Sequence, residues 1–513
     1  MLYVIVALLT SLFTTIYLLL TRHANYWKKR GVPHLKPSLL FGNYGDYVLL
    51  KKNLFATVGD ICIHFLKEPI IGVYYGTEPG IIVKDPEIVK IVTTKDFYYF
   101  SSREVAAYTH KEPLTKNLFN ESGNYWRVLR QNLTPLFSSS KMRNMFPLIK
   151  QCTIQFDKLL TNETKNNAAL GVRLLFSRYT MDCIGSCVFG LETNVMVDDL
   201  KENPFKKISD TIVSTPAVKS LKIIVRSMWP SIFYGLGLNA FEKEISDFFN
   251  SVILKVFGDR NNKPSGRQDF VDFILSFKNK EYIVGDGLKK DEDIKVEYKV
   301  DDELLIAQCV IFFAAGFETS ATTATYTLYE LSKNEVAQRK VIAEVDEYLR
   351  KHDGNIEYDC VTELPYLDAC IDEALRLYPV LGVITREVVE NYTLPSGLVL
   401  EKGLPVHIAV YHMHHNPEYF PEPEEYRPER FYGDEKLNIK PYTYMPFGEG
   451  PRICLGSRFA KMQMISGLVT IFRKYQVAMN SDTPFTIDFD PRNILTIPKN
   501  EIKLKFIPRY VPS

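Results

Sequence analysis

An uncharged segment at the start of the chain places the strongest constraint on how this chain can fold. Residues 2–20, LYVIVALLTSLFTTIYLLL, contain no charged side chain. A helix of this length is roughly 28 Å long, which matches the hydrocarbon core of about 30 Å in a bilayer. Four basic residues follow between positions 22 and 30, and such a cluster stays on the cytosolic side of a membrane. The pattern predicts a transmembrane signal-anchor at residues 1–21, with the rest of the chain in the cytosol.

A cleaved signal peptide is the alternative interpretation of this segment. The apolar run is longer than the about 7–15 residues usual in a signal peptide, and the basic cluster follows the run instead of preceding it. We therefore expect an uncleaved anchor. Residues 22–43 form a basic and proline-rich connector, and Pro33, Pro37 and Gly42 within residues 31–43 predict that this part is stiff and extended. This connector would hold a folded body of residues 44–513 at a fixed angle to the membrane.

The composition is that of one large globular body in a reducing compartment. Of 513 residues, 46% are hydrophobic and 24% are charged, which is ordinary for a globular protein. The net charge of +1 and the lack of a long basic tract argue against nucleic acid as a partner. Eight scattered cysteines without a CxxC pair argue against a disulfide scaffold. We interpret seven of them as small core residues and consider Cys454 separately.

The hydrophobic pattern predicts a mainly α-helical fold with a small β portion. Residues 70–86 have the composition of a short β-hairpin around a Gly-Pro-Gly turn. Asp85 and Pro86 then suit the first positions of a helix. From about residue 124 to residue 275 the pattern is mostly helical, with polar breaks.

The second half of the chain should contain a long central helix. Residues 278–300 are charged and aperiodic, which predicts a mobile surface loop. A helix of about 30 residues is expected from Asp301 onward, and it should pass through the core because its first part is apolar on almost every side. Another helix is expected at about 363–378. Residues 392–411 alternate and turn as a sheet does.

Cys454 lies in a stiff, cationic loop, PFGEGPRICLGSRFA. Its glycines let the backbone approach a flat partner closely, and amide groups turned toward the sulfur would stabilise a thiolate. The helix that begins after Gly456 also favours an anion at its N-terminus, and Arg452 would meet a carboxylate. A haem fits these needs, with iron for the sulfur and propionates for the arginine. A buried free cysteine is the plainer alternative, and the combination with Phe447 and Gly450 argues against it.

The stretch FGEGPRICLG resembles the haem-binding signature of cytochromes P450, and all five positions of that signature match. Further motifs match in the family's order, so the resemblance covers nearly the whole chain. It implies the cytochrome P450 fold, with a single haem-thiolate catalytic domain at residues 44–513. It also implies haem b, iron protoporphyrin IX, bound through an axial Cys454 thiolate, with cofactor contacts from Phe447, Gly448 and Arg452.

The stretch AAGFETS at residues 314–320 resembles the family's oxygen-binding motif A/G-G-x-D/E-T. Gly316 would leave room beside a flat cofactor, and Ala315 is a further cofactor contact by resemblance. In the family the threonine and the acid deliver protons for oxygen activation, which makes Thr319 and Glu318 the catalytic candidates. From the residues alone, the alternative is a small-residue helix crossing in which Thr319 bonds back to a carbonyl one turn earlier.

The stretch WRVLR supplies a second part of the expected cofactor site. Trp126 and Arg130 share a helix face, and an indole N–H and a guanidinium both suit a carboxylate. The stretch resembles the family's W-x-x-x-R, which binds haem propionates, and the edge of an amphipathic helix is the alternative. Arg386 in GVITRE resembles another propionate contact, and Arg103 is a further candidate for that role.

Two other motifs are interpreted as structural. Glu373 and Arg376 are neighbours on a helix, where a surface ion pair is the default interpretation. They resemble the family's E-x-x-R, which engages an arginine in a later loop, here Arg430 of PERF. HMHH at residues 412–415 suggests a metal site, which we reject because a haem-thiolate site needs no second metal.

The resemblance implies a monooxygenase that inserts one oxygen atom from O2 into apolar small molecules. No G-x-G-x-x-G follows a strand, so the electrons must come from a partner. The family implies NADPH–cytochrome P450 reductase, with cytochrome b5 as a second donor, at the endoplasmic reticulum (microsomal) membrane. Arg127, Arg458 and Lys461 are candidates for a basic docking face, with solvated charges as the alternative.

The substrate walls implied by resemblance come from five stretches. They are 101–124, 205–250, Phe312–Thr319, Val380–Ile384 and the PRNILTIP turn. Because these are rich in Phe, Ile, Leu and Tyr, an apolar substrate is expected. The anchor, the connector and NYWKKRGVP resemble insect microsomal P450s that clear plant toxins and insecticides.

Three alternatives remain open at this point. The enzyme could oxidise an endogenous lipid or hormone, or it could be an electron-independent haem-thiolate isomerase or dehydratase that rearranges peroxides. It could also be a membrane-tethered haem protein that carries electrons or senses a gas. The presence of Glu318 and Thr319 favours the monooxygenase, since peroxide-rearranging enzymes can dispense with proton delivery.

Overall fold

The computed structural model describes residues 1–166, 168–197, 202–289 and 294–509. It is 55% helical and 11% strand, which confirms the expected mainly α fold with a small β portion. Among the described residues the α-helices are α1 Leu2–Thr21, α2 Tyr26–Arg30, α3 Gly45–Val48, α4 Leu54–Ile63, α5 Pro86–Lys90, α6 Gly123–Leu133, α7 Ser139–Asn166, α8 Val172–Ile184, α9 Pro204–Val213, α10 Ala217–Met228, α11 Pro230–Gly235, α12 Lys243–Asp259, α13 Phe270–Lys278, α14 Asp302–Gly316, α15 Glu318–Lys333, α16 Glu335–Lys351, α17 Cys360–Glu363, α18 Pro365–Leu377, α19 Val410–His414 and α20 Ser457–Phe472.

The strands form four small sheets. Their bounds are β1 Ile70–Tyr75, β2 Glu78–Val83, β3 Leu170–Gly171, β4 Tyr282–Asp286, β5 Lys295–Lys299, β6 Ile384–Glu387, β7 Tyr392–Thr393, β8 Val399–Leu400, β9 Pro405–Ile408, β10 Tyr475–Met479 and β11 Lys503–Pro508. The largest sheet has the order β1-β2-β9-β6, in which only β2 and β9 are parallel. The others are β10-β11-β3, β4-β5 and β7-β8.

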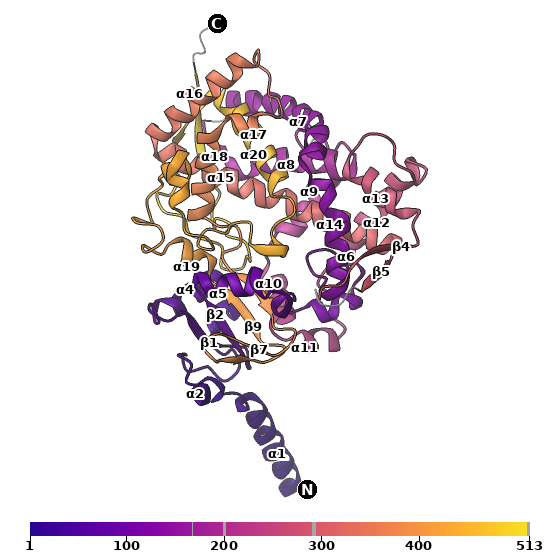
Figure 1. Cartoon of the computed structure of the whole chain (residues 1–513), viewed down its shortest axis with the longest axis vertical. Helices are drawn as coiled ribbons and strands as arrows, with labels where there is room; N and C mark the ends of the chain where they lie inside the picture. The colour runs from indigo at the N-terminus through magenta and orange to yellow at the C-terminus, as the bar shows by residue number, and fades with distance from the viewer. Residues whose placement is uncertain (167, 198–201, 290–293, 510–513) are drawn as a thin grey trace.

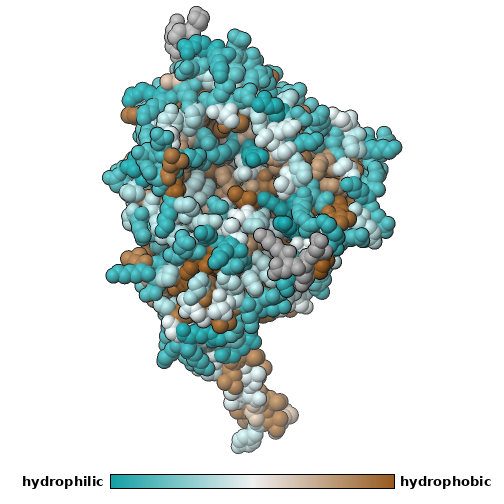
Figure 2. All heavy atoms as spheres, in the orientation of Figure 1, coloured by the Kyte–Doolittle hydropathy of each residue, from teal (hydrophilic) through white to brown (hydrophobic). Residues whose placement is uncertain are grey.

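Helix α1 stands away from the rest of the molecule. Figure 1 shows it projecting from the body, and Figure 2 shows its surface as mostly apolar beside a largely hydrophilic body. None of its residues is buried. The helical stretch Leu2–Arg30 is long and apolar enough to cross a membrane, which fits the expected anchor. The stretch Asp302–Lys333 passes the same test, but 67% of its apolar window is buried, as in a core helix.

The connector packs against the sheet. Trp27 is fully buried, and its Nε1 donates to the carbonyl of Val73 on β1 at 2.8 Å. A Cβ on Gly72 would lie 2.6 Å from the Trp27 ring, so glycine is needed for this contact. The N–H of Gly72 donates to the Pro33 carbonyl at 2.8 Å. The proline-rich segment is therefore held along β1.

The expected hairpin and helix start near residue 85 are confirmed, with a shifted turn. Strands β1 and β2 pair from Ile70 to Val83, and the chain reverses before Glu78, ahead of the expected Gly-Pro-Gly position. Gly76 supplies the positive φ of +66° that this turn requires. The Asp85 carboxylate caps α5 by accepting from the backbone N–H groups of Glu87 and Ile88.

The long central helix is interrupted near its middle. A single helix was expected from Asp301, and the chain instead forms α14 and α15 with a break at Phe317. Asp301 caps α14 through the N–H of Leu304 at 2.8 Å. The hydroxyl of Thr180 on α8 donates to the carbonyl of Phe317 at 2.9 Å. The same carbonyl also accepts from the N–H of Ala321 at 3.0 Å, so Phe317 bonds both to α15 and to a neighbouring helix.

The expectation of a mobile loop at residues 278–300 is wrong for its described part. Strands β4 and β5 form an antiparallel hairpin, with Ile283 paired to Tyr298 at its centre. The hairpin lies on α6 (Figure 1). Residues 290–293 lie outside the described part of the chain. A charged, aperiodic sequence still forms strands here because one apolar side chain, Ile283, is buried against the helices.

Candidate active site

One large cavity lies between α14–α15 on one side and the loop before α20 on the other. Its volume is about 300 Å³. The walls are mainly apolar, and none of the described residues that line it is acidic. The expected site residues that line it are Arg103, Trp126, Arg130, Ala315, Thr319, Arg386, Phe447, Gly448, Arg452 and Cys454. Glu318 is the one expected site residue that does not line it.

Cys454 faces this cavity. It is the one exposed cysteine of the eight, and its exposure is toward the cavity, because Cys454 is one of the lining residues. The loop is held in place by the Cys454 N–H, which donates to the Phe447 carbonyl at 2.8 Å. Burial raises the pKa of the Cys454 thiol, while the N–H of Gly456 and the charge of Arg130 lower that pKa. An electrophilic centre in the cavity would therefore find a sulfur ligand presented by a fixed loop.

Two glycines of the loop are required for different reasons. Gly448 and Gly450 have φ values of +77° and +71°, which favour glycine. A Cβ on Gly450 would lie 1.8 Å from the carbonyl oxygen of Thr93, so this glycine permits a close approach to the protein's own backbone. Beside Gly448 the space is open to 3.9 Å. Of the two, Gly448 is the one that can lie against a flat ligand.

Four arginines surround the cavity without an acidic residue in its lining. Burial lowers the pKa of Arg386 to about 9, with help from the charge of Arg103, and burial lowers the pKa of Arg103 to about 10. Burial also lowers the pKa of Arg452, which Arg103, Arg386 and Arg130 lower further. The Nε of Arg386 is buried without a hydrogen-bond partner in the described protein. Such a cluster is costly unless a ligand supplies negative charge.

Arg452 is fixed by backbone carbonyls. Its guanidinium donates to Ser101 at 2.8 Å, to Glu121 at 2.5 Å and to Phe119 at 3.4 Å. It also lies 4.5 Å from the centroid of the Trp126 ring. Carbonyl groups orient the guanidinium but carry no negative charge that would neutralise it. An anionic ligand could supply that charge.

Thr319 and Glu318 point in different directions. The Thr319 hydroxyl donates to the Ala315 carbonyl at 2.6 Å, which is the back-bonded arrangement given as the alternative. Glu318 is 4% exposed, and its Oε1 lies 2.7 Å from Nη1 of Arg173 on α8. Burial raises the pKa of Glu318, and Arg173 opposes that effect. The acid therefore stands behind the cavity wall that carries the threonine.

Gly316 lies where α14 packs against α8, as the alternative of a small-residue helix crossing predicts. A Cβ at this position would lie 2.2 Å from Cδ1 of Ile184 on α8. The small side chain therefore accommodates a neighbouring helix as well as lining the cavity. The room that Gly316 would leave beside a flat cofactor stays a prediction.

Gln463 is a polar residue of the cavity that the sequence reasoning missed. Its Nε2 donates to the Gly316 carbonyl at 2.9 Å and to Ser320 Oγ at 2.7 Å. Its Oε1 is buried without a partner in the described protein. The signal was present in the sequence, because Gln463 is the one side-chain amide in α20 and lies among its apolar residues.

The substrate walls agree only in part with the expected stretches. Residues from 101–124, Phe312–Thr319 and Val380–Ile384 line the cavity. None of the described residues of 205–250 or of the PRNILTIP turn does. Those two expectations are not met in this structure.

The expected structural motifs are confirmed as a buried network. Glu373 accepts from Arg376 at 2.8 and 2.9 Å and from Arg430 at 3.3 Å. Arg376 also donates to the His414 carbonyl at 2.9 Å. The side chains of Glu373 and Arg376 are fully buried, and neither lines the cavity.

The histidines of HMHH are engaged in local contacts, and they lie on and beside α19 instead of in the expected loop. The Nε2 of His414 accepts from the N–H of Met445 at 3.0 Å. Burial lowers the pKa of His414 to about 3. His415 bonds to the Tyr411 carbonyl at 2.9 Å. In the described part of the chain, no three His, Cys, Asp or Glu side chains gather as a metal site.

Of the three residues expected in a basic docking face, Lys461 forms ion pairs within the protein. Lys461 lies 2.7 Å from Asp368 and 2.9 Å from Asp372, so its charge is already paired. Arg458 is exposed. A docking role therefore stays open for Arg458 and for the partly buried Arg127.

Comparison with known proteins agrees with this site. Residues 33–506 match the family model of cytochrome P450. The chain is 35% identical to cytochrome P450 6B7 of Helicoverpa armigera over 99% of both chains. It is 36% identical to cytochrome P450 6B1 of Papilio polyxenes, over 99% of this chain and 100% of the relative. It is 34% identical to cytochrome P450 6k1 of Blattella germanica, over 98% of this chain and 96% of the relative. The chain belongs to the cytochrome P450 family, whose members are haem-thiolate monooxygenases.

Proposed function

We propose that this P450 inserts one oxygen atom of O2 into apolar small molecules, of the kind found among plant toxins and insecticides, with Cys454 as the axial ligand of its haem. The observation that carries this proposal is the position of Cys454, which faces an apolar cavity rimmed by four arginines. Haem supplies the redox chemistry with dioxygen when bound, and the thiolate makes it suited to oxygen activation.

The residues of the cavity fit a haem. Its two propionates would neutralise the positive charges of the four arginines that line the cavity. A propionate oxygen could also accept from Nε of Arg386, which has no partner in the described protein. Trp126 would complete that edge. The contacts with the flat faces are assigned to Ala315, Phe447 and Gly448, all of which line the cavity.

Thr319 is proposed to hold the proton that oxygen activation consumes. Its Oγ lies in the cavity wall and donates to Ala315, so a short rotation would turn the O–H toward a ligand. Glu318 is proposed to act behind Thr319 by passing protons from the Arg173 side, where the side chain of Arg173 is 26% exposed.

An apolar substrate follows from the walls around Thr319. Phe119, Phe312, Val380 and Leu381 line the cavity, and no acidic group among the described lining residues offers a partner to a cation. The relatives are insect P450s. A detoxifying role is therefore preferred to the oxidation of an endogenous lipid or hormone.

Electrons are proposed to come from NADPH through NADPH–cytochrome P450 reductase, with cytochrome b5 as a second donor. The proposed location is the endoplasmic reticulum membrane, with α1 as the anchor of residues 1–21, residues 22–43 as the connector and the catalytic domain in the cytosol. Support comes from the wholly unburied α1 and from the connector that packs on β1.

The first test is the spectrum of the dithionite-reduced protein with carbon monoxide. A strongly red-shifted Soret band is expected for the native chain and should be lost in Cys454→Ala. Cys360→Ala, which removes a buried thiol outside the cavity lining, should keep it. A native-like band in Cys454→Ala would contradict the assigned ligand.

Turnover then separates the candidate functions. With reductase and NADPH, a panel of apolar plant toxins and insecticides should be oxygenated, and omission of NADPH should abolish the products. Oxidation confined to endogenous lipids or hormones would favour the biosynthetic alternative. Conversion of a lipid hydroperoxide without electrons would favour the isomerase. Absence of turnover in both assays would favour a haem protein that carries electrons or senses a gas.

A further inference from the structure

The β4–β5 hairpin packs against α6, the helix that contains Trp126 and Arg130 of the cavity lining. The contact at its centre is reciprocal. Nε2 of Gln131 on α6 donates to Oδ2 of Asp286 at 2.8 Å, and the N–H of Asp286 donates back to Oε1 of Gln131 at 2.7 Å. The nitrogen and the oxygen of the Gln131 side-chain amide are thus both bonded to Asp286 of the hairpin.

Two further hydrogen bonds join the hairpin segment to other positions along α6. Nδ2 of Asn132 donates to the Val284 carbonyl at 3.0 Å. Near the other end of α6, the N–H of Leu288 donates to Oδ1 of Asn124 at 2.8 Å. The hairpin therefore contacts α6 from its first turn to its last, which fixes both the position of the helix and its rotation.

The hairpin backbone lies directly on the helix at Gly285. A Cβ on Gly285 would lie 2.5 Å from Oε1 of Gln131 and 3.1 Å from Cα of Val128. The φ of Gly285 is not positive, so glycine is needed here for the close approach and not for the strand conformation.

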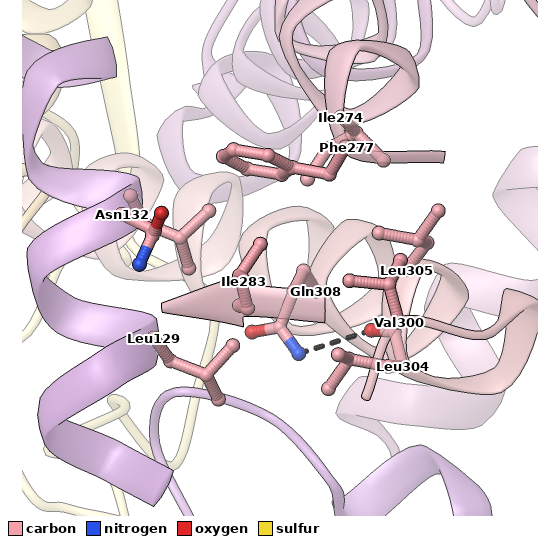
Figure 3. Close-up of a pocket in the computed structure, with 10 residues that line it drawn as sticks. Leu129, Asn132, Ile274, Phe277, Ile283, Val300, Leu304, Leu305 and Gln308 are labelled. Carbon is pink, nitrogen blue, oxygen red and sulfur yellow. Dashed lines mark hydrogen bonds between the residues drawn. The ribbon is translucent and has the colours of Figure 1, made fainter. Parts of the chain in front are cut away.

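Ile283 inserts from the hairpin between α6 and α14. It is 3% exposed and shares a residual cavity of about 10 Å³ with Leu129 of α6 and Leu304 of α14. Figure 3 shows Ile283 on its strand between the helix that carries Leu129 and the segment that carries Leu304 and Gln308. A space this small leaves no room for α6 to shift without steric conflict.

Strand β5 is linked to Arg452 of the cavity through Glu121. The hydroxyl of Tyr298 on β5 donates to Oε1 of Glu121 at 3.2 Å. The carbonyl of the same Glu121 accepts from Arg452 at 2.5 Å. The ring of Tyr298 also packs against Tyr125 of α6, with centroids 4.6 Å apart. One hairpin therefore supports Arg130 through α6 and Arg452 through Glu121.

We propose that the β4–β5 hairpin is a clamp that positions Arg130 and Arg452 for the anionic edge of the haem. Gln131, Ile283, Gly285 and Tyr298 are positioning residues in this scheme, because none of them lines the cavity. An isolated two-stranded hairpin is marginal in water, so the clamp and α6 stabilise each other. The proposal rests on the proposed haem contacts of Arg130 and Arg452.

The first experiment displaces the hairpin without changing any charge. In the haem-loaded enzyme, Gly285→Ala should speed haem transfer to excess apomyoglobin about tenfold, equivalent to about 1.4 kcal/mol. The haem reduction potential should become more negative, because positive charge moves away from the iron. Gly258→Ala on α12, where a Cβ would meet nothing within 4 Å, should change neither quantity. If both variants behave alike, or if only the unfolding midpoint of Gly285→Ala falls, the clamp is refuted.

The second experiment tests the reciprocal contact and provides its own rescue. Gln131→Glu sets a carboxylate against Asp286 and should speed haem transfer. Gln131→Glu combined with Asp286→Asn restores a donor and the native net charge, and should return transfer to the native rate. Asp286→Asn alone should be near native. Failure of the double variant to recover would count against the clamp even if Gly285→Ala did not fold.

The two proposals fail in different ways. If the native chain gives no red-shifted carbon monoxide band, the haem-thiolate assignment itself is at fault. If the native band is present and the hairpin variants leave haem transfer and potential unchanged, only the clamp is wrong.

Discussion

Glu318 is held by Arg173, with Oε1 and Nη1 2.7 Å apart, and stands outside the cavity whose wall contains the adjacent Thr319. Of these two residues of the motif, only Thr319 therefore lines the cavity. Arg173 also lies 3.6 Å from Glu501, and both of these side chains are partly exposed. Glu318 is thus linked to the surface by a partly exposed arginine.

The ion pair predicts unequal effects of removing its two members. Arg173→Met leaves a buried carboxylate unpaired and should lower the free energy of unfolding by about 3 kcal/mol. Glu318→Gln leaves an arginine that still faces Glu501, so its effect should be about 1 kcal/mol. Denaturant unfolding of the haem-loaded protein measures both. Arg339→Met, at an exposed pair on α16, is the matched control and should be neutral. Equal losses in the two variants would contradict the asymmetry.

Thr319→Ala should leave the carbon monoxide band intact and reduce coupling. The proton that Oγ would hold is lost, so more NADPH should end as hydrogen peroxide, about 10-fold or more per product formed. Peroxide and product are measured together with reductase present. Thr325→Ala, which removes a buried, back-bonded hydroxyl of the same helix, serves as the control. Native coupling in Thr319→Ala would argue that the back-bonded arrangement is its whole role.

Local motifs predicted the parts of this site whose geometry is set within a few residues. The loop before Cys454, the pair of Glu373 with Arg376 and the helix start at Asp85 depend on turn, helix and capping geometry at short range. The sequence therefore sufficed to place the cysteine in its loop and the arginine and glutamate side by side.

Contacts between distant segments account for what the sequence reasoning missed. Glu318 is turned by an arginine 145 residues earlier, and Gly316 is constrained by Ile184. The hairpin at 282–299 shows no clear alternation because only Ile283 of β4 is buried. Its stability comes from α6, about 150 residues earlier in the chain, as the bond from Asn132 to Val284 shows. Periodicity cannot report such partners.

Arg452→Lys should weaken both folding and haem retention. A lysine cannot reproduce the planar set of bonds to Ser101, Glu121 and Phe119. Loss of two such bonds should lower the free energy of unfolding by about 2 kcal/mol. Haem transfer to apomyoglobin and denaturant unfolding provide the measurements. Arg458→Lys, at an exposed position in the first turn of α20, should leave both unchanged, and a similar loss there would point to a nonspecific effect of replacing an arginine in this region.

The raised pKa of Glu387 predicts that the free energy of unfolding declines from mildly acidic to neutral pH. Burial raises its pKa from 4.5 to about 7; the charge of Glu104 adds to this, and Lys402 opposes it. Between those values the folded chain holds a proton that the unfolded chain releases, so the free energy of unfolding should fall as pH rises, by at most about 3 kcal/mol. Glu387→Gln cannot titrate and should flatten the decline, whereas Glu347→Gln on the exposed face of α16 should retain it. Denaturant unfolding at a series of pH values from 4.5 to 7.5 decides the matter, and an unchanged slope in Glu387→Gln would show that another buried group carries the pH dependence.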